Sequence, residues 1–312
     1  MSAPPATAAA RAAPVVVIGD VINDVVVRPL GPVAIGTDTS SEVVRLAGGQ
    51  GANQAAWLGV LGVPVRFVSR VGAADAAQHR ADLESVGVEV RFSEDREHAT
   101  GTIVVLVSPS GERSMFTDRG ASRHLTAEDL GADLLEDAAL LHVSGYQLFE
   151  EPSRSAVREL WGSALAAGLP TSVDPASVAS LSAVSPRLFL EWTRGAELVF
   201  PNLVEGRLLT GCDEPDAIVD ALLESFSVVA LKLGADGALA GAADGRRVRL
   251  AAAPAEVVDS TGAGDAFAGG FLAGRLAGAD LAECAAGAVA TAARAVSRIG
   301  ARPPSAPRGA LP

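Results

Sequence analysis

The chain has 312 residues, 49% of them hydrophobic, and a formal net charge of -12 at pH 7. That length and apolar content allow a large buried core in one α/β domain, with or without a small appendage. The acidic balance, with no basic stripe along the chain, argues against nucleic acid or an anionic membrane as a partner. Cys212 and Cys284 lack metal or redox spacing, and apolar stretches such as residues 285–293 are too short to cross a membrane. We therefore expect a cytoplasmic protein.

The N-terminal part of the chain predicts a tail followed by short strands and two helices. Residues 1–13 are rich in Ala and Pro and predict a disordered tail. An apolar run that ends in Gly-Asp predicts a buried parallel strand at residues 14–19. Further strands are expected at residues 24–30, 41–46, 65–71, 102–108 and 113–118, and helices at residues 52–61 and 76–86. The last two strands flank the turn sequence PSGE at residues 109–112, which is a hairpin pattern.

From residue 140 onward, predicted strands and helices alternate. Strands are expected at residues 140–144, 171–174, 197–200, 228–233 and 248–252, and helices at residues 152–167, from 201 through 209, 263–276 and 280–297. Such alternation predicts a doubly wound, mainly parallel sheet flanked by helices. Ligands of these sheets bind where strands end, and Asp20, Asp24 and Asp174 all fall at such points.

Residues 258–267, with the sequence VDSTGAGDAF, carry the clearest chemical signal. Glycines in a strand-to-helix turn leave backbone N–H groups aimed at one point, and a helix that starts near Ala263 adds the positive end of its dipole. The turn is therefore a candidate phosphate site. A carboxylate such as Asp265 does not help to hold an anion, but it fits a base that takes a proton from an attacking hydroxyl. The alternative is a simple Gly-rich turn with Asp265 as a first-turn helix residue.

A second glycine-rich run, GGQGANQAA, occupies residues 48–56. The two runs together resemble the paired signatures of the ribokinase-like (PfkB) family of sugar and nucleoside kinases, GG-x-G-A-N-x-A on the sugar side and D-[TS]-x-G-A-G-D on the phosphate side. The resemblance extends from Val15 to about Pro304. It implies a ribokinase-like fold, in which residues 24–46 and 99–118 form a small β-sheet lid. The nucleotide- and sugar-binding core would consist of residues 14–23, 47–98 and 119–312.

The resemblance implies transfer of the γ-phosphoryl group of ATP to a hydroxyl of a small sugar. Asp265 would be the catalytic base, and backbone N–H groups of Gly262, Ala263 and Gly264 would stabilise charge on the transferred group. Close packing of a helix on the sheet would equally explain these glycines.

The first motif would bind the sugar. Asp24 and Asn53 would bind its hydroxyls, because a carboxylate can accept two hydroxyl hydrogens from a vicinal diol. Gly48 and Gly49 would let the sugar approach the backbone. A helix-capping role is the alternative for Asn53.

The resemblance also implies residues for ATP and Mg²⁺. Asn202 and Glu205 match the family's N-x-x-E motif, in which Glu205 would hold Mg²⁺ through water. The same spacing is a capping box, which is the alternative. Lys232 and Gly234 match the segment beside the ATP phosphates, although Lys232 could instead face the surface.

The C-terminal segment resembles the part of ribokinase that holds a monovalent cation. The matching positions for such a K⁺ site are Asp259, Thr261, Ala295, Arg298 and Gly300. The last ligand position of that motif falls at Pro304 or Ser305.

The substrate stays open among ribose-, fructose- and 2-keto-3-deoxygluconate-like sugars. Ribokinase has Lys where Gln50 stands and Asn where Ile22 stands, which argues against ribose. Arg113 and Arg119 near the lid leave room for an acidic sugar. A nucleoside (adenosine-type) kinase, with Phe116 as the lid aromatic, and a non-catalytic sugar or nucleotide sensor are the alternatives. The family resemblance further implies a homodimer formed through the lid.

Overall fold

The computed structural model describes residues 13–108 and 113–304. Within these residues a nine-stranded sheet forms the body of the molecule. Its strands are β1 (Val15–Ile18), β4 (Val65–Gly72), β5 (Val88–Asp95), β8 (Leu140–Ser144), β9 (Thr171–Asp174), β10 (Leu198–Val199), β11 (Val228–Lys232), β12 (Ala238–Ala242) and β13 (Arg247–Leu250). Their order is β13-β12-β11-β10-β9-β8-β1-β4-β5, and only the β11–β12 and β12–β13 pairs are antiparallel. The predicted doubly wound, mainly parallel sheet is confirmed.

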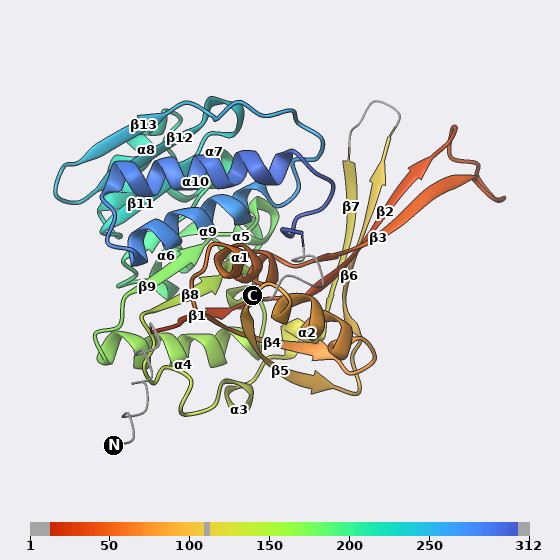
Figure 1. The fold of residues 1–312 in the computed structure, drawn as a ribbon, viewed down its shortest axis with the longest axis horizontal. Helices are drawn as coiled ribbons and strands as arrows, with labels where there is room; N and C mark the ends of the chain where they lie inside the picture. Colours follow the sequence, from red (N-terminus) through yellow and green to blue (C-terminus); the bar gives the residue numbers. More distant parts are fainter. Residues whose placement is uncertain (1–12, 109–112, 305–312) are drawn as a thin grey trace, which may run out of the picture.

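Helices cover both faces of this sheet (Figure 1). One face packs against α1 (Gln50–Val60), α2 (Ala76–Glu84), α9 (Ala263–Leu276) and α10 (Leu281–Val296). The other packs against α3 (Ala127–Leu130), α4 (Ser153–Ala166), α5 (Val178–Val184), α6 (Pro186–Trp192), α7 (Leu203–Thr210) and α8 (Pro215–Leu223). Short 3₁₀ helices occur at η1 (Ala121–His124), η2 (Gly145–Leu148) and η3 (Gly234–Asp236).

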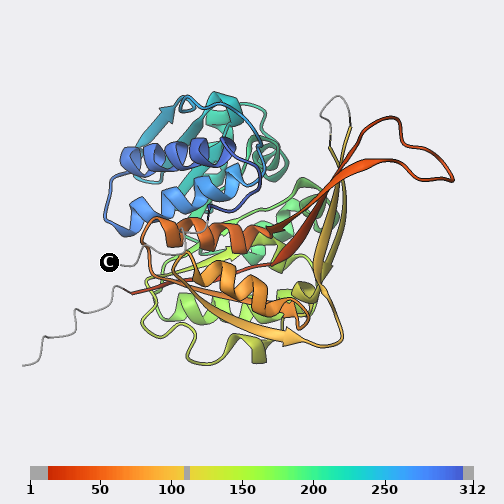
Figure 2. The same ribbon diagram turned by 45° about the vertical axis from the view of Figure 1, so that its right-hand side comes forward.

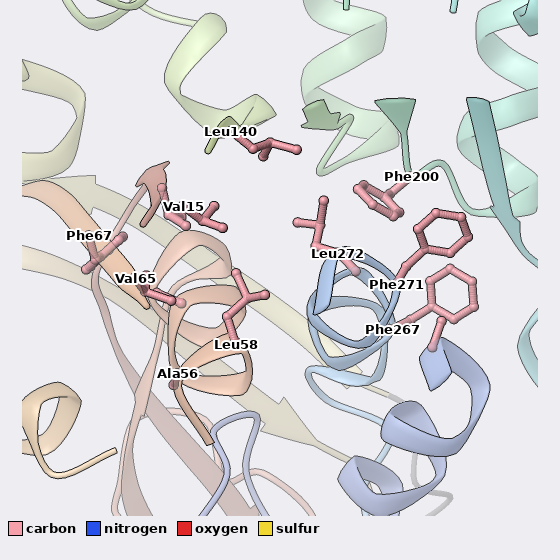
Figure 3. Packing of buried hydrophobic residues seen from close by; sticks show 14 of the residues in the cluster. Val15, Ala56, Leu58, Val65, Phe67, Leu140, Phe200, Phe267, Phe271 and Leu272 are labelled. Carbon is pink, nitrogen blue, oxygen red and sulfur yellow. The ribbon is translucent and has the colours of Figure 1, made fainter. Parts of the chain in front are cut away.

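The central strand β1 shows why its sequence is continuously apolar. Val15 and Val17 face the α1 side of the sheet, whereas Val16 and Ile18 face the α4 side, and all four are fully buried. Figure 3 shows the α1 side, where aromatic and aliphatic side chains of α9 pack near Phe200 at the end of β10. This packing fixes α9, and with it the turn before α9, against the sheet.

A second, smaller sheet projects from the body (Figures 1 and 2). It contains β2 (Ile22–Pro29), β3 (Ser41–Gly48), β6 (Thr100–Val107) and β7 (Arg113–Gly120) in the order β3-β2-β6-β7. The two hairpins join through a parallel pairing of β2 with β6. The hairpin turn expected at residues 109–112 lies outside the described residues, and so do residues 1–12 of the tail expected at residues 1–13.

Some elements are present that the sequence pattern did not predict. β5 is an edge strand in which polar and apolar residues alternate, and β12 is built from Ala, Leu and Gly, which form strands poorly by themselves. Pairing with β4 and with β11 therefore stabilises them as strands. No helix in the described parts of the chain is long and apolar enough to span a membrane.

Candidate active site

A cavity of about 420 Å³ opens where β1 and β8 end. From β1 the strand order continues outwards through β4 to β5, and from the adjacent β8 it continues in the opposite direction to β13. The cavity therefore lies at the point where the strand order reverses, which is where ligands of such sheets bind. Apolar side chains of β2 and β6 form one wall, and the turn before α9 forms another. The predicted site residues that line the cavity are Asp24, Gly49, Asn53, Asp259, Thr261, Gly262, Asp265 and Gly300.

The turn before α9 brings backbone donors to this cavity. Gly262 adopts a left-handed conformation with φ of 76°, which glycine adopts without strain. A Cβ at this position would lie 2.5 Å from the Cα of Ala301, so the turn also packs on the C-terminal segment. The first N–H groups of a helix have no acceptor within that helix, and the dipole adds positive potential. The turn is therefore suited to bind an anion.

Asp265 lies in the first turn of α9 and faces α1. Its Oδ2 accepts a hydrogen bond from Nδ2 of Asn53 at 2.8 Å, which brings the two glycine-rich motifs into contact. Burial raises the pKa of Asp265 well above its usual range, and the neighbouring Asp174 adds to this, against the opposing effects of Asn53 and Lys232. A carboxylate with a raised pKa is a stronger base once ionised, which suits proton removal from a hydroxyl.

Asp24 and Asn53 supply acceptors on the other side of the cavity. A Cβ at Gly48 would lie 2.2 Å from Oδ2 of Asp24, so glycine is required for this carboxylate to lie against β3. Burial and the nearby Asp20 raise the pKa of Asp24 to about 6. Asn53 lies inside α1, which is capped by Gly49, so the capping alternative for Asn53 is wrong. Its Oδ1 is buried and has no hydrogen-bond partner among the described residues, which leaves an acceptor for a ligand hydroxyl.

Asp20, Arg119 and Tyr146 also line the cavity, and the two motifs did not indicate them. Oδ2 of Asp20 accepts a hydrogen bond from Nη1 of Arg119 at 2.8 Å, and its Oδ1 accepts one from the N–H of Gly51 at 3.2 Å. The guanidinium carbon of Arg119 lies 3.2 Å from the ring centroid of Tyr146. The Gly-Asp end of β1 was a signal for Asp20, but nothing local marks Arg119 as its partner.

Lys232 is not a surface residue, contrary to one of the two predictions for it. Its Nζ lies 2.8 Å from Oδ2 of Asp174, and its side chain is only 14% exposed. A Cβ at Gly264 would lie 3.4 Å from Nζ, so the ammonium group lies at the start of α9. Burial acts to lower the pKa of Lys232, but Asp174 and Glu205 outweigh it and raise that pKa above its usual value. The ammonium group is therefore charged beside the anion-binding turn.

Asn202 and Glu205 form the capping box of α7. Oδ1 of Asn202 accepts from the N–H groups of Val204 and Glu205 at 2.9 Å each, and Oε2 of Glu205 accepts from the N–H of Asn202 at 2.8 Å. Glu205 is buried, which raises its pKa. Gly234 follows β11 in a left-handed conformation, and a Cβ at this position would have no neighbouring atom within 4 Å. Capping thus accounts for the local hydrogen bonds, and an additional role at the phosphates stays a prediction.

The predicted cation segment folds around Asp259. Its Oδ1 accepts from the N–H and Oγ1 of Thr261 at 3.0 and 2.7 Å, and its Oδ2 accepts from the N–H of Gly300 at 3.0 Å. Ala295 is buried near the end of α10, and Arg298 is half-buried. Pro304 has no side-chain oxygen, and Ser305 lies outside the described residues. These hydrogen bonds fix the conformation of the segment, and the K⁺ site stays a prediction.

Phe116 points away from the cavity. In β7, Met115 pairs with Val105 and lines the cavity, whereas Phe116 pairs with Val104 on the opposite face of the small sheet and is 62% exposed. Phe116 therefore cannot stack on a ligand in this cavity. The side chain of Arg113 lies outside the described part of the structure.

The chain is similar to known proteins over most of its length. The family description "pfkB family carbohydrate kinase" matches residues 12–308. Fructokinase-1 of Oryza sativa subsp. japonica is 30% identical over 276 residues, which cover 85% of this chain and 83% of that protein. The structure of adenosine kinase from Sinorhizobium meliloti is 26% identical, has a TM-score of 0.83 and covers 94% of this chain and 96% of that one. Ribokinase of Arabidopsis thaliana, solved with ribose and ATP, is 27% identical, has a TM-score of 0.77 and covers 93% of this chain and 94% of that one.

Proposed function

The chain belongs to the pfkB family of carbohydrate kinases, and from that premise we propose that it transfers the γ-phosphoryl group of ATP to a hydroxyl of a small neutral sugar. Family members such as fructokinase are phosphotransferases that act on hydroxyl groups, so the reaction class holds for this chain. The contact between Asp265 and Asn53, in a cavity that Asp24 and Gly262 also line, carries the proposal. This contact supports the proposal because it brings the residue that we propose as the base together with the proposed sugar-binding acceptors and the turn before α9.

In this reaction, Asp265 takes the proton from the attacking sugar hydroxyl while its oxygen bonds to the γ-phosphorus. The bond from that phosphorus to the bridging oxygen breaks, and ADP leaves. Backbone N–H groups of Gly262, Ala263 and Gly264 hold the charge on the transferred group, for which the N–H of Ala263 leaves the carbonyl of Ser260, to which it donates at 3.3 Å in the structure. The ammonium of Lys232 at the start of α9 adds a positive charge.

Mg²⁺ would neutralise and orient the phosphates of ATP. The described residues contain no cluster of three His, Cys, Asp or Glu side chains that could hold a metal ion directly. A buried Glu205, already fixed by Asn202, suits an ion that keeps most of its water ligands. We assign Glu205 and Asn202 to this water-mediated role.

Two arginines line the cavity, Arg28, which is exposed on β2, and the less exposed Arg119. We favour a neutral sugar because Arg119 is already neutralised. Arg119 is paired with the buried Asp20 and stacked on Tyr146, so it is not free for a substrate carboxylate or phosphate. The adjacent Asp24 also disfavours an anion, whereas it can accept hydrogen bonds from two hydroxyls. Apolar side chains of β2 and β6 in the same cavity fit the C–H faces of a sugar ring. In this scheme the small sheet is a lid over the sugar.

A nucleoside kinase is the second candidate, since adenosine kinase of Sinorhizobium meliloti is among the structural relatives. The outward position of Phe116 argues against it, because no aromatic ring of the lid then covers a base. A non-catalytic sensor would not need Asp265.

We further propose a homodimer formed through the lid. The small sheet exposes large apolar side chains on both faces, Val44 and Met115 on the cavity face and Val43 and Phe116 on the other. Exposed apolar patches of this kind commonly mark association surfaces. Light scattering of the purified protein would test this, and a monomer at all concentrations would contradict it. Because ATP is supplied inside the cell, we also place the protein in the cytoplasm.

The test of function is an ATP-consumption screen over neutral pentoses and hexoses, keto-deoxy sugar acids, sugar phosphates and nucleosides. The Asp265→Asn variant serves as the control for contaminating kinases. We expect turnover with a neutral sugar by the wild type alone. Turnover with only sugar acids or only nucleosides would overturn the neutral-sugar assignment, and no turnover with any acceptor would overturn the kinase assignment.

A further inference from the structure

Residues 300–302, which we call the C-terminal strap, run between the two halves of the cavity. Gly300 donates its N–H to Asp259, and the carbonyl of Ala301 accepts from Nε1 of Trp57 at 2.9 Å. Arg302 donates from Nη2 to the carbonyl oxygen of Gly48 at 2.8 Å. Three consecutive residues thus contact the phosphate-side turn, α1 and the glycine pair of the sugar-binding motif.

The glycine pair is held from several sides. The carboxylate of Asp24 lies against Cα of Gly48, and a Cβ at Gly49 would lie 2.4 Å from the carbonyl oxygen of Asp20. Arg302 contacts the carbonyl of Gly48 from the strap. A shift of this carbonyl would therefore move the backbone against which Asp24 rests.

Arg302 is an unusual residue for this position. Its Nε and Nη1 are buried and have no hydrogen-bond partner among the residues that the structure describes. Burial lowers the pKa of Arg302 to about 10, so the guanidinium is still charged at neutral pH. Burial of a cation costs folding free energy, and a neutral side chain at this position of the strap would avoid that cost. A charge-assisted hydrogen bond to a carbonyl is stronger than a neutral one, which is what a tether requires.

We propose that Arg302 is a positioning residue for the sugar, which fixes the Gly48–Gly49 backbone against Asp24 and ties it to the phosphate-side turn through the strap. This rests on the proposed function, since it takes Asp24 and the glycine pair as the sugar-binding half of the site. Arg302 lines no part of the cavity in the described structure; it acts through the carbonyl of Gly48 and through its charge, which acts to lower the pKa of Asp24.

The test compares Arg302→Met, which removes the hydrogen bond and the charge, with Arg302→Lys, which keeps a charge but loses the planar donor group. Arg294→Met is the matched control, because Arg294 is exposed near the end of α10 and lies 5.7 Å from the Trp57 ring centroid. The measurements are the KM for sugar, the KM for ATP, kcat, and the shift in Tm that sugar produces in the absence of ATP.

We expect Arg302→Met to raise the KM for sugar about tenfold or more and to reduce the sugar-induced shift in Tm, because the Gly48–Gly49 backbone and Asp24 lose their fixed positions and small misplacements of binding groups have effects of this size. The KM for ATP should stay within about twofold, Arg302→Lys should fall between Met and wild type, and Arg294→Met should match wild type. Equal changes in both KM values, or none in either, would overturn the proposal.

If Arg302→Met does not fold, Arg302→Lys decides the question. Its KM for sugar must then exceed the wild-type value severalfold at an unchanged KM for ATP, and a wild-type KM for sugar overturns the proposal. A wild type that phosphorylates no sugar refutes the proposed function and this inference with it. An active wild type with an unaffected Arg302→Met variant refutes the inference alone.

Discussion

Replacing Asp265 by Asn should remove most phosphoryl transfer without weakening the fold. Asn has nearly the same shape, and its oxygen can still accept the hydrogen bond from Asn53 that spans 2.8 Å in the structure. It cannot take up the hydroxyl proton, so kcat should fall about 10²–10⁴-fold, or roughly 3–5 kcal/mol of transition-state stabilisation. The KM values for sugar and ATP should change little, because the binding groups are untouched.

The stability of the same variant provides an independent check. Burial raises the pKa of Asp265 above its value in the unfolded chain, so the unfolded chain releases this proton at lower pH than the folded protein. The wild type therefore loses folding stability as the pH rises from the pKa of Asp265 in the unfolded chain to its pKa in the folded protein. The Asp265→Asn variant has no titrating group at this position and does not lose this stability. The Tm of Asp265→Asn relative to wild type should therefore rise as the pH increases above about 4.

A coupled ATP assay and thermal unfolding measure both quantities. Asp280→Asn is the control, because Asp280 caps α10 by accepting from the N–H of Glu283, and Asn caps helices equally well. The base assignment is refuted if Asp265→Asn turns over its best sugar at a near wild-type rate. A large fall in Tm alongside lost activity would mean that the variant unfolds, which would contradict the stability reasoning.

Four further expectations concern the same site. Asp24→Ala should raise the KM for sugar about ten- to a hundredfold through the loss of charged hydrogen bonds, and an effect on the KM for ATP alone would contradict the sugar assignment. Because the pKa of Asp24 is about 6 and its ionised form accepts hydroxyl hydrogens, kcat/KM for sugar should fall as the pH drops through this value. A kcat/KM that stays constant at acid pH would exclude Asp24 as the group that binds the sugar in its ionised form. Gly262→Ala should destabilise the fold by about 1–3 kcal/mol beyond the cost of a left-handed alanine, since its Cβ would lie 2.5 Å from Ala301. The control is Gly211→Ala, because Gly211 has a φ of 74° and open space around the position of a Cβ, and equal losses of Tm in the two variants would contradict the clash at Gly262. If K⁺ binds behind the turn at Asp259, kcat should be higher in KCl than in tetramethylammonium chloride at fixed ionic strength and saturating Mg²⁺, and equal kcat values would leave the segment a structural turn.

Local sequence was sufficient for the parts of the site that depend on backbone shape. The glycines of the turn before α9 and the N-x-x-E spacing at Asn202 each specify a local conformation, and both occur where the sequence predicted them. The alternation of strands and helices likewise predicted the parallel sheet, because burial on both faces demands continuous apolar strands such as β1. Together with the family resemblance of the two glycine-rich runs, these features predicted the reaction class, whereas Asp265 as its base stays a prediction.

Tertiary structure alone decided which charges face one another. Arg119 meets Asp20 across 99 residues, Lys232 meets Asp174 across 58, and Arg302 meets Gly48 across 254. No local spacing in the sequence could reveal any of these pairs. From the sequence alone, Arg119 could equally have been a free cation that binds an acidic sugar. The sequence therefore determined the fold and the reaction class, whereas the charge balance of the candidate site, and with it the substrate that we favour, depends on strands and helices that are far apart in the chain. The physical reason is that an ion pair forms only between groups that the fold brings within a few ångströms.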